Sequence, residues 1–352
     1  MYDNNDIQQL DHPSIHRWYR FVLSYPDHFV KSMIIRSKID PNGIILDPFL
    51  GTGTTVVEAK KLGFHSIGIE TNPICVLASR VKSNWHLNPE KIAEYLNHIK
   101  TDFLNEIRLF KTDTSSGLFS YINLYPNQSK LKSLMPIDHK LLNKKYISPL
   151  PWTKIGLLKQ IIHKYIIEPE YLDLFLLILA KTFRYSANVK FAPDICCIKP
   201  KIDVNVIGFY EISIKEVVDD LHKMIRNHSI SNPTPLIVKG DSRFINTLLN
   251  EYQDKIDVVI TSPPYPVEKD YTRITRLESS ILDIFKDTKD AQTIKKTMIR
   301  SSTRQVYKDD HEKEKIKDIP MVLMISKAIT ELCVGGYGHS VCTSFLPNFL
   351  SA

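Results

Sequence analysis

Residues 44–59 read IILDPFLGTGTTVVEA, and this stretch decides the fold. Three apolar residues, an acid, a Gly-x-Gly turn and a helix-forming run follow one another, which predicts a strand, a tight loop and a helix. Glycine lets the backbone of such a loop approach a ligand closely and adopt dihedral angles that side chains forbid. The helix that follows directs its free N–H groups at the loop. We therefore expect an open α/β sheet with a nucleotide-like ligand at the carboxyl end of its first strand.

The loop differs from two other nucleotide-binding loops. A phosphate-binding P-loop has a lysine after its last glycine, whereas Thr54 stands at that position, so ATP and GTP are excluded. The dinucleotide pattern G-x-G-x-x-G lacks its third glycine, because Val56 occupies that place. For this motif by itself, a glycine-rich turn without a ligand remains the alternative.

The composition is that of an ordinary globular protein. The 352 residues suffice for one large domain or two, with 43% hydrophobic and 24% charged residues. Five cysteines form no C-x-x-C pair, so neither a zinc site nor a disulfide framework is expected, and a reducing cytosol is favoured. The polar, acidic N-terminus is unlike a signal peptide, and no apolar run is long enough to span a membrane. The net charge of +7 permits a polyanionic partner without requiring one.

A second strand is predicted at residues 66–70, and it ends at Glu70. Glu70 lies 17 residues beyond Gly53, close to the roughly 20 residues that separate the glycine loop from an acid in nucleotide-binding sheets. A carboxylate has two oxygens and can accept both hydroxyls of a ribose. We therefore expect Glu70 to bind a ribose, and a solvated acid at a strand end is the alternative.

Helices dominate the middle of the chain. Apolar residues recur at helical spacing in the ranges 76–85, 91–109, 154–167, 171–184 and 212–226. The range 112–151 is polar and lysine-rich, which suits either a solvated loop or a phosphate-contacting surface. Residues 184–193, RYSANVKFAP, mix basic, aromatic and amide side chains that suit a nucleic-acid groove, and the end of a core helix explains them equally well.

The sheet is predicted to resume after residue 235. Residues 236–239 form a strand before Gly240-Asp241, and residues 256–260 form a buried strand that ends at Thr261-Ser262. Because the carboxyl ends of parallel strands meet at one edge of a sheet, the polar residues at these ends are expected to lie together. They are Asp47, Glu70, Asp241 and Ser262.

The tetrapeptide Ser262-Pro263-Pro264-Tyr265 is the most specific stretch of the chain. Consecutive prolines stiffen the backbone and remove two N–H donors, so the loop presents carbonyl oxygens as fixed acceptors. Together with the Ser262 hydroxyl, these oxygens can accept both protons of a planar exocyclic amine. Tyr265 offers a flat face on which a base can stack. A stiff turn with a structural role is the alternative for this tetrapeptide in isolation.

The two loops together resemble the motifs of DNA amino-methyltransferases. The range 47–55, DPFLGTGTT, is similar to their cofactor-binding motif, and the range 261–265, TSPPY, is similar to their catalytic motif in the form typical of cytosine-N4 enzymes. Adenine-N6 enzymes more often carry Asp or Asn at the serine position. The resemblance extends over residues 12–336 and is weakest in the range 113–150.

The resemblance implies S-adenosylmethionine as cofactor and the exocyclic N4 of cytosine in double-stranded DNA as methyl acceptor. Adenine-N6 or RNA methylation, and DNA binding by an inactive truncated chain, remain alternatives. The glycine loop would hold the methionine end of the cofactor, Glu70 its ribose and Asp241 its adenine amine. The implied cofactor-binding residues are Asp47, Phe49, Gly51, Gly53, Thr54, Glu70 and Asp241. The implied catalytic residues are Ser262, Pro263, Pro264 and Tyr265.

Phosphate contacts are expected downstream of the catalytic motif, because they must offset the cost of extracting a base from DNA. The candidate DNA-binding residues are Arg273, Arg276, Lys295, Lys296, Arg300 and Arg304. A solvated helix face or loop explains the last four equally well. Enzymes of this kind are bacterial or archaeal cytoplasmic proteins, and a cognate restriction endonuclease is the implied functional partner.

The implied fold is α/β, a Rossmann-like S-adenosylmethionine-dependent methyltransferase sheet with a large, mainly helical insertion. Residues 1–75 and 235–352 would form the catalytic domain, and residues 76–234 the insertion, which is the expected target-recognition region. Such sheets usually continue for three strands after the catalytic one, whereas only the range 335–345 is a candidate here. We therefore expect the C-terminal strands to be missing, and a second chain would then complete a split enzyme.

Overall fold

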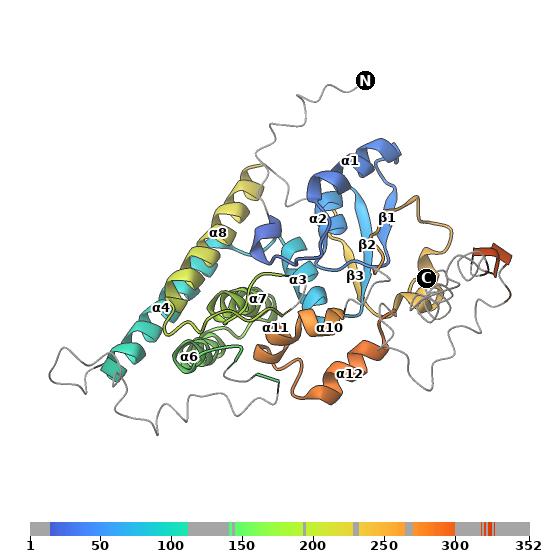
Figure 1. The fold of residues 1–352 in the computed structure, drawn as a ribbon. Helices are drawn as coiled ribbons and strands as arrows, with labels where there is room; N and C mark the ends of the chain where they lie inside the picture. The colour runs from blue at the N-terminus through green and yellow to red at the C-terminus, as the bar shows by residue number, and fades with distance from the viewer. Residues whose placement is uncertain are drawn as a thin grey trace.

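The computed structural model describes residues 15–111, 141–142, 145–192, 195–227, 232–264 and 270–299, together with a few residues between 318 and 327. In these ranges a small parallel sheet lies beside a group of long helices (Figure 1). This arrangement confirms the mixed α/β class. The range 335–345 and the residues Tyr265, Arg300 and Arg304 lie outside the described residues.

Within the described residues the sheet has four strands in the order β3-β2-β1-β4, and their pairings are parallel. The strands are β1 (Ile44–Asp47), β2 (His65–Glu70), β3 (Leu236–Lys239) and β4 (Val258–Val259). Leu46 in β1 lies opposite Ile67 in β2 on one side and Val259 in β4 on the other. The glycine loop therefore begins between the carboxyl ends of two neighbouring strands. β4 is shorter than the predicted strand at residues 256–260.

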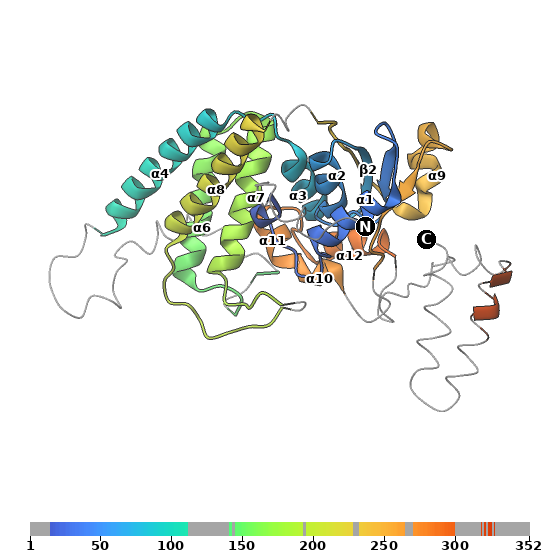
Figure 2. The ribbon, with the colours of Figure 1, turned by 90° about the horizontal axis from the view of Figure 1, so that it is seen from above.

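Both faces of the sheet are covered. Helices α1 (Asp27–Ser37) and α2 (Thr54–Lys61) lie on one face, where Val30 and Ile34 cluster with Ile45 of β1. The other face packs against the short segments α9 (Ile245–Leu248) and η4 (Asn250–Tyr252). Figure 2 shows α9 and α2 on opposite sides of β2. Covering both faces is the general requirement for a parallel sheet, whose strands are apolar on both sides.

Four long helices form a separate layer beside the sheet (Figures 1 and 2). They are α4 (Pro89–Lys111), α6 (Pro149–Tyr165), α7 (Pro169–Ser186) and α8 (Val206–Arg226). Helix α3 (Pro73–Ser83) packs against both α2 and α7, so it joins this layer to the sheet. One hydrophobic cluster runs from Val57 in α2 through Ala78 in α3 to Phe175 in α7.

The predicted helices are confirmed, but several begin earlier than their apolar periodicity indicates. Helices α3, α4, α6 and α7 all begin at a proline, at Pro73, Pro89, Pro149 and Pro169. Proline is favoured in the first turn of a helix, because its missing N–H would have no partner there and its φ angle already suits the helix. In the sequence such a proline looks like a helix breaker, so the predicted starts fall too late.

Short elements complete the described chain. They are η1 (Ile15–Trp18), η3 (Ser242–Phe244), α10 (Tyr271–Ile274), α11 (Arg276–Ile281) and α12 (Thr288–Lys296). η1 is fastened to α8, because Arg17 and the Trp18 indole N–H both donate to the buried carboxylate of Asp220 at 2.6 and 2.9 Å. Among the described helices, none combines the length and apolar character needed to cross a membrane.

Candidate active site

The glycine loop after β1 uses its two glycines for different purposes. Both have positive φ, +56° at Gly51 and +88° at Gly53, a backbone conformation that side chains disfavour. A Cβ atom at Gly53 would lie 2.9 Å from Cβ of Ser79 in α3, whereas at Gly51 it would meet nothing within 4 Å. Gly53 therefore permits the loop to pack against α3, and Gly51 faces open space.

Asp47 is fully buried behind this loop. Its carboxylate accepts hydrogen bonds from the Thr55 hydroxyl (2.5 Å), the Thr261 hydroxyl (2.7 Å), the Phe49 N–H (3.0 Å) and the Tyr25 hydroxyl (3.1 Å). Burial raises the pKa of Asp47, while these donors act in the opposite direction. Asp47 thus joins the start of α2, the end of β4 and the N-terminal segment. The sequence led us to expect it among the cofactor contacts, but it is not part of the cavity wall described next.

A cavity opens at the carboxyl edge of the sheet, with about 870 Å³ of empty space including its open mouth. Of the residues expected from the sequence, its wall contains Phe49, Gly51, Thr54, Glu70, Asp241, Ser262, Pro263 and Pro264. The structure therefore brings the ends of β2, β3 and β4 to one cavity beside the glycine loop, as their positions in the sequence predicted.

Glu70 is held in place by the backbone. Its two oxygens accept the N–H groups of Gly51 (2.8 Å) and Asn72 (2.7 Å). Burial is the largest effect and raises the pKa of Glu70 to about 7, although the backbone donors lower it. Since a carboxylate offers about four acceptor positions, both oxygens can still accept hydrogen bonds from a ligand in the cavity.

Asp241 is oriented by its neighbour Arg243. The Arg243 Nε lies 2.9 and 3.0 Å from the two Asp241 oxygens, and Nη2 lies 2.5 Å from Oδ2. This ion pair offsets the charge of Asp241 at the cavity wall. The next residue, Ser242, donates its hydroxyl to the Pro48 carbonyl at 2.6 Å, so the end of β3 is tied directly to the glycine loop.

The expected DNA-binding residues have different surroundings. Arg273 on α10 is exposed, whereas the Arg276 guanidinium donates to the Tyr146 hydroxyl (2.8 Å) and lies over its ring. Lys295 donates to Asp270 at 2.7 Å, and Lys296 is exposed. Arg273 and Lys296 therefore face solvent, while Arg276 and Lys295 also make internal contacts.

Arg184, the first residue of the range 184–193, agrees with the alternative that this range is the end of a core helix. Arg184 is mostly buried and lies 3.3 Å from a Glu278 carboxylate oxygen. Tyr185 stacks on Phe209 with ring centroids 3.9 Å apart, and Phe191 lies beneath the Arg20 guanidinium. These side chains contact other parts of the protein, and Tyr185 and Phe191 are also exposed.

Several cavity residues were not among the expected contacts. Phe21 and Tyr25 come from the segment before α1, and Met298 and Ile299 come from the residues after α12. The aromatic residues before α1 therefore form part of the cavity wall. Residues 298–299 carry no local signal of a cavity wall, because only the fold brings them there, with Thr297 hydrogen-bonded to Thr71 at the end of β2.

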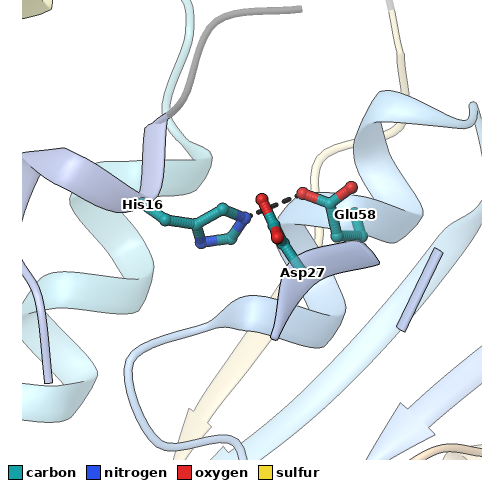
Figure 3. A group of neighbouring side chains, drawn as sticks. All are labelled: His16, Asp27 and Glu58. Atoms are coloured by element: carbon teal, nitrogen blue, oxygen red, sulfur yellow. Dashed lines mark hydrogen bonds and ion pairs between the residues drawn. The ribbon is translucent and has the colours of Figure 1, made fainter. Parts of the chain in front are cut away.

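Three neighbouring side chains are of the types that bind metal ions. They are His16, Asp27 and Glu58 (Figure 3). Their ligand atoms lie within 4.8 Å of one another. His16 Nε2 and Glu58 Oε1 are 2.8 Å apart, and Lys61 donates to the same Glu58 oxygen at 2.7 Å. Lys61 already neutralises this carboxylate, and we assign no ion to the group.

Known proteins similar to this chain are DNA methyltransferases. A family model described as DNA methylase matches residues 2–79. The Type II methyltransferase M.BsoBI of Geobacillus stearothermophilus is 25% identical over 287 residues, which are 77% of this chain and 53% of that protein. M.MvaI of Kocuria varians is 24% identical over 258 residues, or 68% and 51% of the two chains.

A third relative shares a shorter region. The Type II methyltransferase M.MjaII of Methanocaldococcus jannaschii is 31% identical over 98 residues, which are 27% of this chain and 18% of that protein. The chain spans about half the length of M.BsoBI and M.MvaI. No solved structure is significantly similar to it.

Proposed function

We propose that this relative of the DNA amino-methyltransferases of restriction–modification systems transfers a methyl group from S-adenosylmethionine to the exocyclic N4 of cytosine in a specific DNA sequence. The observation that carries the proposal is the cavity at the edge of the sheet. Its wall combines the glycine loop with Glu70, Asp241 and the Ser262-Pro263-Pro264 segment. One side of the cavity thus suits a nucleoside, and the other suits a planar amine.

The cavity wall has the chemistry that S-adenosylmethionine requires. Gly51 lines the cavity, and the space beside it would be filled by any side chain. Glu70 can accept the two ribose hydroxyls, Asp241 can accept the adenine amine, and Phe49 supplies an apolar surface nearby. Thr54 adds a hydroxyl, while Gly53 and Asp47 hold the shape of the loop. When bound, the cofactor supplies an electrophilic methyl group.

The Ser262-Pro263-Pro264 segment is suited to hold the acceptor amine. Pro263 and Pro264 have no N–H, so the amine meets carbonyl oxygens and the Ser262 hydroxyl as acceptors. We propose that Tyr265 stacks on the extracted cytosine. Transfer is then direct, and its rate depends mainly on positioning, an effect that reaches roughly 7–11 kcal/mol in well-oriented systems. The choice of cytosine over adenine rests on serine at position 262.

DNA would be held by the basic residues after the catalytic loop. The proposed phosphate contacts are Arg273 and Lys296, which are exposed, with Arg276, Lys295, Arg300 and Arg304 as further candidates. Residues 1–75 and 235–352 would form a Rossmann-like catalytic domain, and residues 76–234 would recognise the target sequence. A cognate restriction endonuclease is the proposed functional partner, because the relatives are Type II methyltransferases.

The proposal is tested by supplying the protein with tritium-labelled S-adenosylmethionine and DNA of mixed sequence, then digesting the DNA and separating the nucleosides. We expect the label in N4-methylcytosine. Label in N6-methyladenine would refute the choice of base and leave the methyltransferase assignment intact. Absence of both label transfer and cofactor binding would refute the enzyme assignment.

Tyr265→Ala separates the two halves of the site. It should reduce methyl transfer by about 10- to 100-fold, since stacking of a base on an aromatic ring contributes about 1–3 kcal/mol. Cofactor binding, measured by calorimetry, should stay close to that of the unchanged protein. Tyr252→Ala is a control, because Tyr252 packs against the sheet and is not part of the cavity wall. Equal loss of transfer and cofactor binding in Tyr265→Ala would contradict this division of roles.

A further inference from the structure

Lys82 is a buried cation beneath the glycine loop. It lies near the end of α3 and is 1% exposed. Its Nζ donates to the Thr52 carbonyl at 3.2 Å. A lysine ammonium carries three N–H donors, and within the described residues no other acceptor for Nζ is found. A buried ammonium with unused donors is costly unless an anion or another acceptor reaches it.

An additional cavity with Lys82 in its wall lies beside the proposed cofactor site. Lys82, Arg20, His16 and Asp27 line this cavity. The two cavities share wall residues, so they are neighbours on the same loop. The shared residues are Phe21, Ser24, Tyr25, Thr52 and Thr54. The additional cavity therefore extends the site past Thr52 and Thr54 into charged surroundings.

We propose that Lys82 binds the carboxylate at the amino-acid end of the methyl donor. This inference rests on the proposed function, since it concerns one end of the same ligand. The amino-acid end carries one carboxylate and one ammonium. The cavity offers Lys82 for the first and Asp27 for the second, which matches both charges. Lys82 thereby becomes a binding residue that connects the ligand to the Thr52 carbonyl of the loop.

The electrostatics agree with an anion at this position. Burial lowers the pKa of Lys82 to about 7, and the neighbouring Cys75 acts weakly in the opposite direction. His16 also faces Lys82, and burial lowers its pKa. A bound carboxylate raises the pKa of Lys82 again, so binding above pH 7 takes up a proton. Glu70 has a pKa of about 7 as well, so its protonation must be separated from that of Lys82.

Lys60 provides a matched control. It is another buried lysine, and burial lowers its pKa to about 8. Its Nζ donates to the Ser83 carbonyl at 2.8 Å and lies over the Trp85 ring, and neither cavity includes it. Removing its charge perturbs the same region of the fold without touching the proposed carboxylate site.

The experiment is calorimetric titration with two ligands that share an adenosine and a thioether. S-adenosylhomocysteine has the amino-acid end, whereas 5′-methylthioadenosine lacks it. Lys82→Met should weaken the binding of S-adenosylhomocysteine by about 10- to 100-fold, which is the range expected for loss of a hydrogen bond to a charged group. The affinity for 5′-methylthioadenosine should stay unchanged in Lys82→Met. Lys60→Met should leave the affinities for both ligands unchanged. Thermal melting of each variant checks that it is folded.

A measurement on the unchanged protein avoids dependence on the variants. At pH 8, titrations in two buffers with different ionisation enthalpies should show proton uptake with S-adenosylhomocysteine beyond that with 5′-methylthioadenosine. Both ligands carry the ribose, so any contribution of Glu70 to proton uptake cancels when the two ligands are compared. Equal proton uptake, or equal weakening of both ligands in Lys82→Met, overturns the carboxylate role and leaves the proposed function standing. If neither ligand binds the unchanged protein, the proposed function falls together with this inference.

Discussion

At the scale of single residues, Gly51 and Gly53 show how one short motif carries two different constraints. Both need positive φ, but only Gly53 lies against another helix. A Cβ atom at Gly53 would lie 2.9 Å from the Cβ atom of Ser79. Gly51 instead lines the cavity and donates its N–H to Glu70. The first glycine thus serves the ligand site, and the second serves the packing of the loop.

Gly53→Ala is expected to lower the free energy of unfolding by about 2–5 kcal/mol. The left-handed backbone contributes about 1–2 kcal/mol and overpacking against Ser79 about 1–3 kcal/mol. Gly51→Ala is the control. It should lower the free energy of unfolding by only about 1–2 kcal/mol, which is the contribution of the left-handed backbone. It should also weaken cofactor binding, because the added methyl group enters the cavity. Urea unfolding followed by circular dichroism measures both. Equal losses of stability would show that Ser79 does not restrict the loop.

At the scale of elements, a buried ion pair joins α7 to α11. Arg184 in α7 contacts both Glu278 carboxylate oxygens, at 3.3 and 3.5 Å, and also donates to the Ile274 carbonyl. Burial raises the pKa of Glu278, and Arg184 lowers it. The pair connects the helical layer to the segment that follows the catalytic loop.

Arg184→Met should destabilise the protein by about 3–5 kcal/mol, because it leaves Glu278 buried without its cation. The double variant Arg184→Met with Glu278→Leu should recover most of this loss, since a well-packed apolar pair often replaces a buried ion pair. The control is Lys181→Met, whose partner Glu216 is partly exposed, with an expected cost of about 1 kcal/mol or less. A double variant no more stable than Arg184→Met would contradict this account.

At the scale of the whole molecule, helices α2 and α3 share one core with the helical layer. The main hydrophobic cluster contains residues of α2 and α3 together with residues of α4, α6, α7 and α8. All three tryptophans of the chain, Trp18, Trp85 and Trp152, lie in this cluster. The predicted insertion at residues 76–234 contains the long helices of the helical layer. Its side chains nevertheless belong to the same hydrophobic cluster as Val57 of α2.

We therefore expect a single cooperative unfolding transition. Tryptophan fluorescence reports on the shared core, and far-ultraviolet circular dichroism reports on all helices and strands. Their urea transitions should coincide, because neither layer keeps its core when the other unfolds. Two separated transitions would show instead that the helical layer is an independent domain. Trp152→Phe, which removes the probe in α6, should leave the fluorescence midpoint unchanged apart from a small loss of stability.

Local patterns predicted much of this structure, and their errors have physical causes. Apolar spacing located the long helices, and alternation of glycine, acid and apolar runs located β1 and β2. The helix starts were placed too late because proline in a first turn looks like a breaker. Lys82 was missed because nothing local distinguishes a buried lysine from an exposed one. Arg184 looked suited to nucleic acid, yet its surroundings are set by α11, about 90 residues further along the chain.

The sequence by itself determined the strand–loop–helix unit at residues 44–59 and the stiff Ser-Pro-Pro turn, because glycine and proline restrict the backbone wherever they stand. It also determined that polar strand ends share one edge, since parallel strands point the same way. Only the tertiary structure decided that Asp47 lies behind the loop, that Met298 lines the cavity, and that Lys82 lies beneath Thr52. These outcomes depend on burial and on partners far away in the chain, which no local pattern contains.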